Sequence, residues 1–415
     1  MQIGIVGLGY VGLPLAVAFA EAGHDVVGVD LDANKIEALA RGESYIEDIA
    51  SEKLQELADR IKATSRYAAL AKVEAIVICV PTPLTPNREP DLGPLLDTSR
   101  SLATVIQSGQ LVVVESTTYP GTTREEVGPL LEESGLVAGT DFNLAFSPER
   151  IDPGRTDYYM RNTPKVVGGL TEACHARAVA LYEEICDTVV PVSTLEAAEL
   201  TKLLENIFRS VNIALVNELA IIADRMNIDI WEVVGAADTK PYGFMRFEPG
   251  PGMGGHCLPV DPFYLSWRAR QFEVPTEFIE LAGVVNQKMP FFCVEKIARA
   301  LNDQEKPIKG SKIVIVGVSY KAGVGDMRES PAIKIMRLLN ERGANLVYHD
   351  DYVPALEEFG LTNTPLDDAL AGADCAAIIT AHPGIDLEKL VADSALVVDF
   401  RGATRGMSAE NLVRL

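Results

Sequence analysis

Two groups of residues have the types and spacing that chemistry on a bound ligand requires. The first is Gly7-Leu8-Gly9-Tyr10-Val11-Gly12, a GxGxxG motif that follows an apolar run at 2–7 and opens a helical pattern at 12–22. The first glycine allows a tight turn, the second lets a pyrophosphate approach the backbone, and the third brings helix and strand together. The helix N-terminus then faces the phosphates. The motif therefore predicts a dinucleotide site.

Asp30 follows the next strand pattern, at 25–29. A carboxylate there accepts hydrogen bonds from the adenosine ribose hydroxyls and repels a 2′-phosphate, which favours NAD over NADP. The alternative interpretations are an FAD site or a fold that keeps the loop without its cofactor. Two further loops, Val80-Pro81-Thr82-Pro83 and Glu115-Ser116-Thr117-Thr118, follow strand patterns where ligands meet parallel sheets. Simple turn chemistry of proline and threonine is the alternative there.

The second group centres on Cys257, which lies in the glycine-rich loop GPGMGGHCLPVDP at 250–262 with Asp261 four residues on. Glycine at this density lets backbone amides approach a ligand closely. A cysteine in a polar loop is a candidate nucleophile, provided that a nearby cation or helix N-terminus favours its thiolate.

A long helical pattern at about 194–228 supplies such a cation. Lys202, Asn206 and Arg209 share one face of it, although a solvated polar stripe is the alternative. The stretches at 146–151 and 319–330 are polar and contain Arg150, Lys321 and Arg328. Arg and Lys there are suited to phosphate binding, and exposed ion pairs are the alternative.

The elements that position these residues indicate an α/β protein with two Rossmann-like parts. Strand patterns and helical patterns alternate through the first part, which predicts a doubly wound parallel sheet covered by helices on both faces. A second strand–helix–strand series begins with KIVIVG at 312–317. We expect an N-terminal Rossmann domain at 1–192, a helical connector with a dimer interface at 193–300, and a smaller C-terminal α/β domain at 301–415.

Composition narrows the class of protein. The 415 residues carry a net charge of −22, a surface that repels phosphate backbones and makes nucleic acid a poor partner. No run of about 18 apolar residues predicts a membrane span, and a strand pattern from Gln2 leaves no room for a signal peptide. Six scattered cysteines and five histidines show no zinc-ligand spacing, so we expect no metal and a reducing, cytoplasmic compartment.

The motifs together resemble the UDP-sugar 6-dehydrogenase family, which includes the UDP-glucose, UDP-N-acetylglucosamine and UDP-N-acetylmannosamine dehydrogenases. The resemblance covers essentially the whole chain. The segments that are most similar to the UDP-N-acetylglucosamine branch are ESTTYPGTT, SPERIDPG, TKPYGFM and PGPGMGGHCLPVDPFYL. It rests on the motifs GLGYVG, VPTP, ESTTYPGTT, SPER, KLLEN, GGHCLPVDP, SYK, DMRESPA and DFRG.

The resemblance implies oxidation of the sugar C6 alcohol to a carboxylate with two NAD. Cys257 would capture the aldehyde as a thiohemiacetal, which becomes a thioester and is hydrolysed. Lys202 and Asn206 would stabilise the C6 oxygen, and Lys202 with Asp261 would manage the alcohol proton. Thr117 and Glu149 would hold the hydrolytic water. Which of Lys202, Asp261 and Glu149 acts as the base in each step stays open.

The resemblance also implies the ligand contacts, with the C-terminal domain binding UDP. The cofactor contacts are the glycine motif with Tyr10, Val11, Asp30, Lys35, Thr82, Thr117 and Arg328. The UDP-sugar contacts are Arg150, Ile151, Lys202, Asn206, Arg209, Gly254, Tyr320, Lys321 and Arg401.

One departure concerns the hairpin before the glycine-rich loop, where the mannosamine branch carries His and Arg. Here Arg246 would replace that cation, reaching the site of a neighbouring subunit. This departure favours UDP-N-acetylglucosamine over UDP-N-acetylmannosamine, with UDP-glucose also open. An alternative from another class is a sensor that binds nucleotide sugar or NAD without catalysis; intact Lys202, Asn206, Cys257 and Asp261 argue against it.

Overall fold

The protein was analysed as a computed structural model that describes residues 1–415 except 47, 86, 152–156 and 256–257. Its contacts divide the chain into two compact units. Unit 1 comprises residues 1–205 and 263–275, and unit 2 comprises residues 206–262 and 276–415. The boundary falls inside one long helix, α7 (Leu195–Met226). The division into three domains that the sequence suggests stays a prediction.

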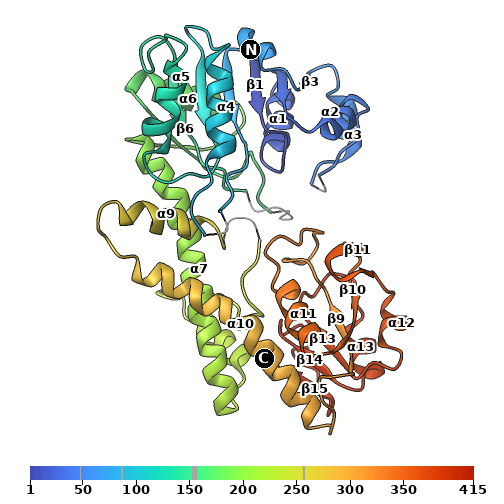
Figure 1. The fold of residues 1–415 in the computed structure, drawn as a ribbon. Coiled ribbons are helices and arrows are strands. Elements are labelled where there is room, and N and C mark those ends of the chain that lie inside the picture. The colour runs from blue at the N-terminus through green and yellow to red at the C-terminus, as the bar shows by residue number, and fades with distance from the viewer. Residues whose placement is uncertain (47, 86, 152–156, 256–257) are drawn as a thin grey trace. The chain divides into compact units, whose positions relative to one another are not determined.

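Unit 1 is built on an eight-stranded sheet with the order β3-β2-β1-β4-β5-β6-β7-β8 (Figure 1). Every residue of β4 and β5 is buried, so both faces of the central strands are covered, as the apolar runs predict. The strands are β1 (Gln2–Val6), β2 (Asp25–Val29), β3 (Ile61–Thr64), β4 (Ala75–Ile78), β5 (Leu111–Val114), β6 (Asn143–Phe146), β7 (Lys165–Gly169) and β8 (Val189–Val192).

Helices α1 and α6 pack on the same face of this sheet, where Phe19 and Tyr182 meet with ring centroids 6.4 Å apart. The predicted β-α-β opening is confirmed, because β1 and β2 pair in parallel around α1. The helices of unit 1 are α1 (Gly12–Glu21), α2 (Ala33–Ala40), α3 (Ser51–Glu56), η1 (Tyr67–Lys72), α4 (Gly93–Ala103), η2 (Thr123–Val127), α5 (Gly128–Glu132) and α6 (Glu172–Tyr182).

The sheet departs from the predicted parallel arrangement at one place. Strands β1 to β6 are parallel, but β7 pairs antiparallel to β6. A parallel return needs a crossover of a dozen or more residues, usually with a helix. The described part of the connection at 147–164 holds no helix. The chain therefore turns back directly, which brings the first residue of β7 to the carboxyl edge of the neighbouring strands.

Unit 2 contains a five-stranded parallel sheet with the order β10-β9-β13-β14-β15. A single hydrophobic core joins this sheet to α8, α10 and the second half of α7. Its strands are β9 (Lys312–Val316), β10 (Asn345–His349), β13 (Cys375–Ile378), β14 (Val397–Asp399) and β15 (Leu412–Arg414), with a separate two-stranded pair, β11 (Ala355–Leu356) and β12 (Leu361–Thr362).

The part of the predicted helical connector that follows the glycine-rich loop consists of two helices. They are separated at 271–276, where Glu273 adopts a positive φ of 57° and Pro275 follows. The remaining helices are α8 (Ile230–Asp238), α9 (Asp261–Arg270), α10 (Glu277–Asn302), α11 (Pro331–Glu341), η3 (Glu357–Phe359), α12 (Leu366–Leu370) and α13 (Leu387–Asp393).

Among the described residues, α7 is long and apolar enough to cross a membrane by length and composition. Long core helices of soluble proteins meet the same criterion, and α7 contains charged residues such as Arg209 and Glu218.

Candidate functional site

The glycine motif forms a tight turn between β1 and α1. Gly7 has a φ of +91°, and a Cβ there would lie 2.6 Å from the carbonyl oxygen of Cys79. A Cβ on Gly12 would lie 1.8 Å from the carbonyl oxygen of Gly7. A Cβ on Gly9, by contrast, would meet no atom within 4 Å. The backbone at Gly9 is therefore open to a ligand, and these residues fit a dinucleotide pyrophosphate at the N-terminus of α1.

Asp30 lies directly after β2, facing the same turn. Its carboxylate accepts the backbone N–H of Leu8 at 2.8 Å and the ammonium group of Lys35 at 3.1 Å. Burial opposes ionisation, but the N–H groups of Asp32 and Leu8 and the charge of Lys35 outweigh it and lower the pKa of Asp30. Asp30 is thus a carboxylate at neutral pH, as its predicted role with ribose hydroxyls requires.

The loops after β4 and β5 are tied to each other. Ser116 Oγ donates to the carbonyl oxygen of Val80 at 2.7 Å, and Thr82 is buried beneath Tyr264, whose hydroxyl donates to its carbonyl oxygen at 2.9 Å. The order of the strands reverses between β1 and β4, where ligands bind in this kind of sheet. Thr82 and the half-buried Thr117 therefore lie on the loops expected to meet the cofactor.

A buried carboxylate on α7 holds the next part of the loop after β5. Glu199 accepts hydrogen bonds from the N–H groups of Gly121 and Thr123, at 2.6 and 2.9 Å, and from the Thr123 hydroxyl at 2.7 Å. Burial outweighs these bonds and raises its pKa to about 7. Sequence reasoning missed Glu199, although it lies one helical turn before Lys202.

Glu149 combines burial with an ionised carboxylate. Its Oε1 accepts the N–H groups of Arg150 and Ile151 at 2.8 and 2.6 Å, and its Oε2 lies 3.5 Å from the Lys165 ammonium. Lys202 Nζ donates to its carbonyl oxygen at 2.5 Å. Burial on its own would raise the pKa of Glu149. The charge of Lys165, the N–H of Ile151 and the charge of Lys202 have the larger effect, so the pKa is lower than that of an ordinary glutamate. The arrangement can accept a proton from water.

The predicted polar face of α7 is buried where it bears Lys202 and Asn206. In unit 2, Asn206 Nδ2 donates to Asp261 Oδ2 at 2.5 Å, so the first residue of α9 orients this amide. Arg209, one turn further along the helix, is exposed, so the choice between a substrate contact and a solvated polar stripe stays open there. In unit 1, Arg150 pairs with Glu205 at 2.7 Å.

The glycine-rich loop of unit 2 packs directly on predicted substrate residues. A Cβ on Gly254 would lie 2.8 Å from Tyr320 Cβ, and one on Gly250 would lie 2.8 Å from a guanidinium nitrogen of Arg401. Arg401 Nε also donates to the carbonyl oxygen of Ile379 at 2.7 Å. The loop and these side chains therefore lie together, next to the stretch at 319–330 that contains Lys321.

Two buried asparagines that sequence reasoning missed hold this loop on the helices. Asn217 of α7 accepts the N–H of Gly250 at 2.9 Å and donates to Asn286 of α10 at 2.9 Å. Asn286 in turn donates to the carbonyl oxygen of Ser210 at 3.1 Å. The sequence signal was an amide that directly follows two apolar residues in each helix.

Two predicted arginines of unit 2 form ion pairs within their own segments. Arg246 pairs with Asp238 at 3.3 Å and Glu248 at 2.8 Å, and Arg328 pairs with Asp326 at 2.6 Å. Their proposed ligand roles stay predictions, and each would require these pairs to open or to be shared.

Cys257 lies outside the described residues. The five cysteines that the structure describes are free and buried. Burial raises the pKa of Cys186 to about 11 and that of Cys375 to about 12, which keeps these thiols protonated. In the described part of the chain, no group of three or more His, Cys, Asp or Glu side chains is arranged to hold a metal.

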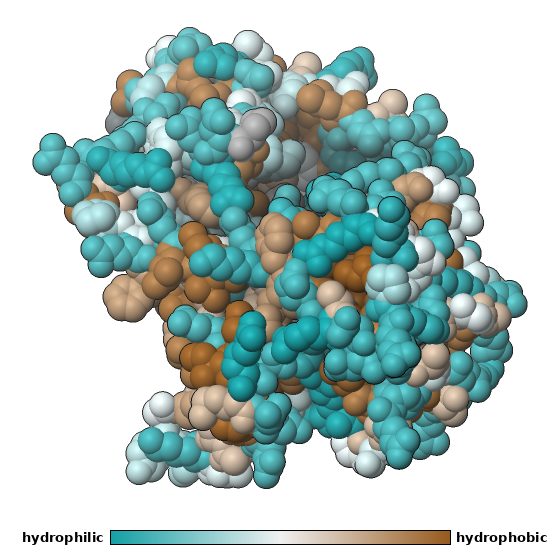
Figure 2. Space-filling view, turned by 60° about the horizontal axis from the view of Figure 1, so that its bottom comes forward, coloured by the Kyte–Doolittle hydropathy of each residue, from teal (hydrophilic) through white to brown (hydrophobic). Residues whose placement is uncertain are grey.

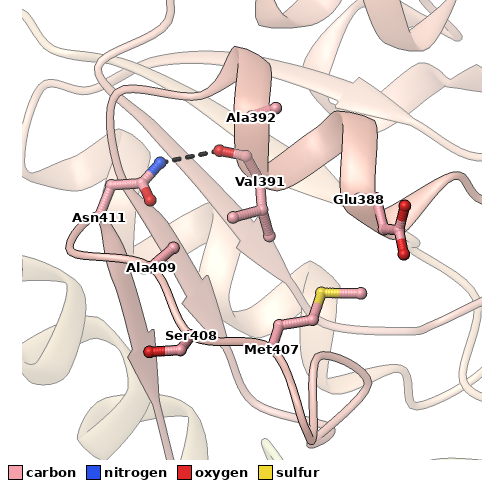
Figure 3. Close-up of a pocket in the computed structure, with 7 residues that line it drawn as sticks. All are labelled: Glu388, Val391, Ala392, Met407, Ser408, Ala409 and Asn411. Atoms are coloured by element: carbon pink, nitrogen blue, oxygen red, sulfur yellow. Dashed lines mark hydrogen bonds between the residues drawn. The ribbon is translucent and has the colours of Figure 1, made fainter.

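A shallow pocket in unit 2 contains none of the predicted site residues (Figure 3). It lies between α13 and the segment before β15, where Asn411 Nδ2 donates to the carbonyl oxygen of Val391 at 2.8 Å. Its lining residues are Glu388, Val391, Ala392, Met407, Ser408, Ala409 and Asn411. No cation lines it, so it is unsuited to a diphosphate.

Comparison with known proteins decides the family. Profiles of the UDP-glucose/GDP-mannose dehydrogenase family match in order along the chain: the NAD binding domain at 1–186, the central domain at 196–288 and the UDP binding domain at 314–406. The chain belongs to the UDP-glucose/GDP-mannose dehydrogenase family. It is an NAD-dependent UDP-sugar dehydrogenase, and the predicted cofactor and fold class are confirmed.

The relatives of this dehydrogenase differ in the sugar that their names specify. It is 36% identical over 379 residues to UDP-N-acetyl-D-glucosamine 6-dehydrogenase of Pseudomonas aeruginosa, covering 90% of this chain and 89% of that protein. It is also 36% identical over 387 residues to UDP-N-acetyl-D-mannosamine dehydrogenase of Pyrococcus horikoshii, covering 92% and 90%. A solved structure of UDP-D-ManNAc dehydrogenase from P. horikoshii matches with a TM-score of 0.92 and 33% identity, covering 100% and 99% of the two chains.

Proposed function

We propose that this dehydrogenase oxidises the C6 hydroxyl of UDP-N-acetylglucosamine to a carboxylate. The overall change consumes one water and two NAD, and it yields the uronic acid, two NADH and three protons. The observation that carries the proposal is the ionised, nearly buried Glu149 beside Lys202, because the hydrolysis that completes the oxidation needs a base ready at neutral pH.

In the first oxidation, Lys202 and Asn206 stabilise negative charge that develops on the C6 oxygen. The bond from Asn206 to Asp261 supports this role, because it fixes one amide hydrogen and thereby orients the group. Asp261 and Lys202 take up the alcohol proton. NAD would supply the hydride acceptor for both oxidations. The residues that would hold it are Gly7, Gly9, Tyr10, Val11, Gly12, Asp30, Lys35, Thr82 and Thr117, with Arg328 as a further contact.

Cys257 then retains the aldehyde. Its thiolate adds to the C6 carbon and forms a thiohemiacetal, so the aldehyde does not escape between the two oxidations. Loss of the second hydride, together with the proton of the thiohemiacetal hydroxyl, leaves a thioester. Glu149 removes a proton from a water that Thr117 also holds, the resulting hydroxide adds to the thioester carbon, and the Cys257 thiolate leaves with its electron pair.

The UDP part of the substrate is negatively charged and requires cations on an otherwise acidic protein. Arg401, Lys321 and Arg209 supply that charge in this proposal. The packing of Gly250 and Gly254 against Arg401 and Tyr320 supports it, because larger residues would displace these side chains. The other proposed contacts are Arg150, Ile151 and Arg246.

The choice of sugar is tested with a panel of UDP-N-acetylglucosamine, UDP-N-acetylmannosamine and UDP-glucose. The proposal predicts the highest kcat/KM for UDP-N-acetylglucosamine. A higher value for either of the other sugars would retain the reaction and reject the branch. Absence of turnover with all three, together with binding of NAD and UDP-sugar by calorimetry, would favour the non-catalytic sensor.

We also propose a cytoplasmic homodimer. In unit 2, α7 exposes Leu215, Leu219 and Ile222 on one face, and α10 exposes Phe278 and Leu281. Figure 2 shows apolar side chains gathered on the side of the molecule where these helices lie. Large exposed apolar patches mark association surfaces, and a twofold pair of copies buries the same patch twice.

The dimer is tested by light scattering after size-exclusion chromatography. Leu219→Glu places a charge in the exposed face and should yield monomers. Glu232→Gln on α8 changes an exposed polar side chain and serves as the control. A dimer that persists in Leu219→Glu would place the interface elsewhere. The cytoplasmic location is supported by the five free cysteines, which suit a reducing compartment.

A further inference from the structure

Three buried side chains behind Glu149 have no role in the reaction so far described. Lys165 Nζ lies 2.8 Å from Glu115 Oε2 and 3.5 Å from Glu149 Oε2. The Tyr182 hydroxyl donates to the other oxygen of Glu115. The ammonium group is thus shared unequally between two carboxylates, with the shorter contact to the one that is fully enclosed.

The reversed strand explains why Lys165 reaches Glu149. The antiparallel register pairs Phe146 with Gly168, and Ser147 Oγ continues it by donating to the carbonyl oxygen of Val166 at 2.8 Å. Extending this register by three residues from Phe146 places Glu149 opposite Lys165. In a parallel strand, the first residue would lie at the opposite edge of the sheet. The antiparallel pairing of β6 and β7 therefore brings the Lys165 ammonium group to the Glu149 carboxylate.

Of the three charged side chains, Glu149 is the most exposed, so it is the one that a water molecule can reach. The Glu115 side chain is 0% exposed and that of Lys165 is 4% exposed, whereas that of Glu149 retains 11%. Glu149 Oε1 is already occupied by two backbone N–H groups. Lys165 thus fixes the remaining oxygen at a longer distance, which holds its direction while leaving a lone pair for a water.

The other groups that face this cluster are neutral or compensated. Burial raises the pKa of the Cys186 thiol to about 11 and raises that of Cys79, so both are protonated. Burial also raises the pKa of Tyr182. On the Glu149 side, the nearby cations among the described residues are Lys202, which binds its carbonyl oxygen, and Arg150, whose guanidinium pairs with Glu205. Within that part of the chain, Lys165 is the cation whose ammonium group contacts the Glu149 carboxylate itself.

We propose that Lys165 is a positioning residue that keeps Glu149 ionised and aimed at the hydrolytic water, and that Glu115 and Tyr182 restrain its ammonium group. This inference rests on the proposed function, in which Glu149 is the base of thioester hydrolysis. Without Lys165, the effect of burial on Glu149 dominates, and a smaller fraction of its side chain is ionised at neutral pH. Hydride transfer does not use this carboxylate and is unaffected.

The test is a pre-steady-state assay of NADH with the UDP-sugar that the panel identifies. Lys165→Met should form two NADH per active site in a burst, followed by a phase slowed about tenfold or more by hydrolysis. An acyl adduct on Cys257 should accumulate and be detected by intact-protein mass spectrometry after acid quenching. The acidic limb of the hydrolysis rate should move upward by about one to three pH units. Lys165→Arg keeps the charge and should restore hydrolysis.

Lys165→Met leaves Glu115 as a buried, unpaired charge, which risks the fold. The double variant Glu115→Gln, Lys165→Met removes both charges and should show the same burst and adduct. Glu149→Gln separates this inference from the proposed function. If Glu149→Gln accumulates no adduct, the assignment of the base fails. If Glu149→Gln accumulates it and the folded Lys165 variants hydrolyse at the wild-type rate and pH, the role of Lys165 is refuted.

Discussion

Glu199 gives a stability prediction whose sign and size follow from its surroundings. Its pKa rises from an ordinary 4.5 to about 7, because burial opposes the carboxylate more than its hydrogen bonds stabilise it. Between these two values, the folded chain holds a proton that the unfolded chain has released. The free energy of unfolding therefore falls as pH rises through this window, by up to about 3 kcal/mol from this one group.

The perturbation is Glu199→Gln, which cannot ionise. Its amide oxygen can accept the hydrogen bonds from Thr123, but its NH₂ group faces the N–H of Gly121. The variant should accordingly be less stable than wild type at pH 5, by about 1–3 kcal/mol for the unmatched donors. From pH 5 to pH 8 it should gain about 2.5 kcal/mol relative to wild type, because only the wild type loses stability at this position.

The assay is urea unfolding at a series of pH values, with the variant compared to wild type so that all other titrating groups cancel. Trp267 packs against Tyr119 in unit 1 with ring centroids 5.0 Å apart, so its fluorescence reports on the loop that Glu199 holds. A Trp231→Phe background in both proteins removes the tryptophan of unit 2. Glu196→Gln is the control, because its pairing with Arg124 lowers the pKa of Glu196 and confines its effect to acidic pH.

A stability difference that stays constant from pH 5 to pH 8 would refute the reasoning. A difference that moves against the variant as pH rises would show that the hydrogen bonds outweigh burial and that Glu199 is ionised throughout.

Three further predictions concern the cofactor and the thiol. Asp30→Ala should weaken NAD binding by about 1–3 kcal/mol in calorimetry, since it removes the carboxylate expected to bind the ribose, and unchanged affinity would make Asp30 only a structural residue. Gly12→Ala should lower the thermal stability, because its Cβ would meet a carbonyl oxygen, whereas Gly9→Ala should leave stability unchanged and weaken NAD binding; equal stabilities would contradict the packing at Gly12. Cys257→Ala should abolish acid formation and leave the melting temperature and NAD affinity unchanged, and a wild-type yield of acid would remove the covalent mechanism.

Local patterns predict much of the fold. Hydrophobic periodicity and the placement of glycine predict the strand at 2–6, the helix that begins at Gly12 and the long helix that contains Lys202. The reversed β7 does not, because the direction of a strand depends on the connection that precedes it rather than on its own residues. Lys165 was missed for that reason, since its position at the active edge follows only from the reversal.

Candidate site residues were predictable to the extent that their role is local. The glycine motif and Asp30 are linked by a short, regular unit, so their proximity follows from the sequence. Other contacts join segments that are far apart in the chain. They are the hydrogen bonds from the loop after β5 to Glu199, and the bond between Asn217 and Asn286. A single buried polar residue in an apolar helix signals such a contact but does not identify its partner.

The central claim, a two-step oxidation at C6, is tested most directly by the yield of NADH per UDP-N-acetylglucosamine consumed, with the product identified by mass spectrometry. The account predicts two NADH per sugar and a uronic acid as the product. One NADH per sugar with release of the aldehyde would contradict it.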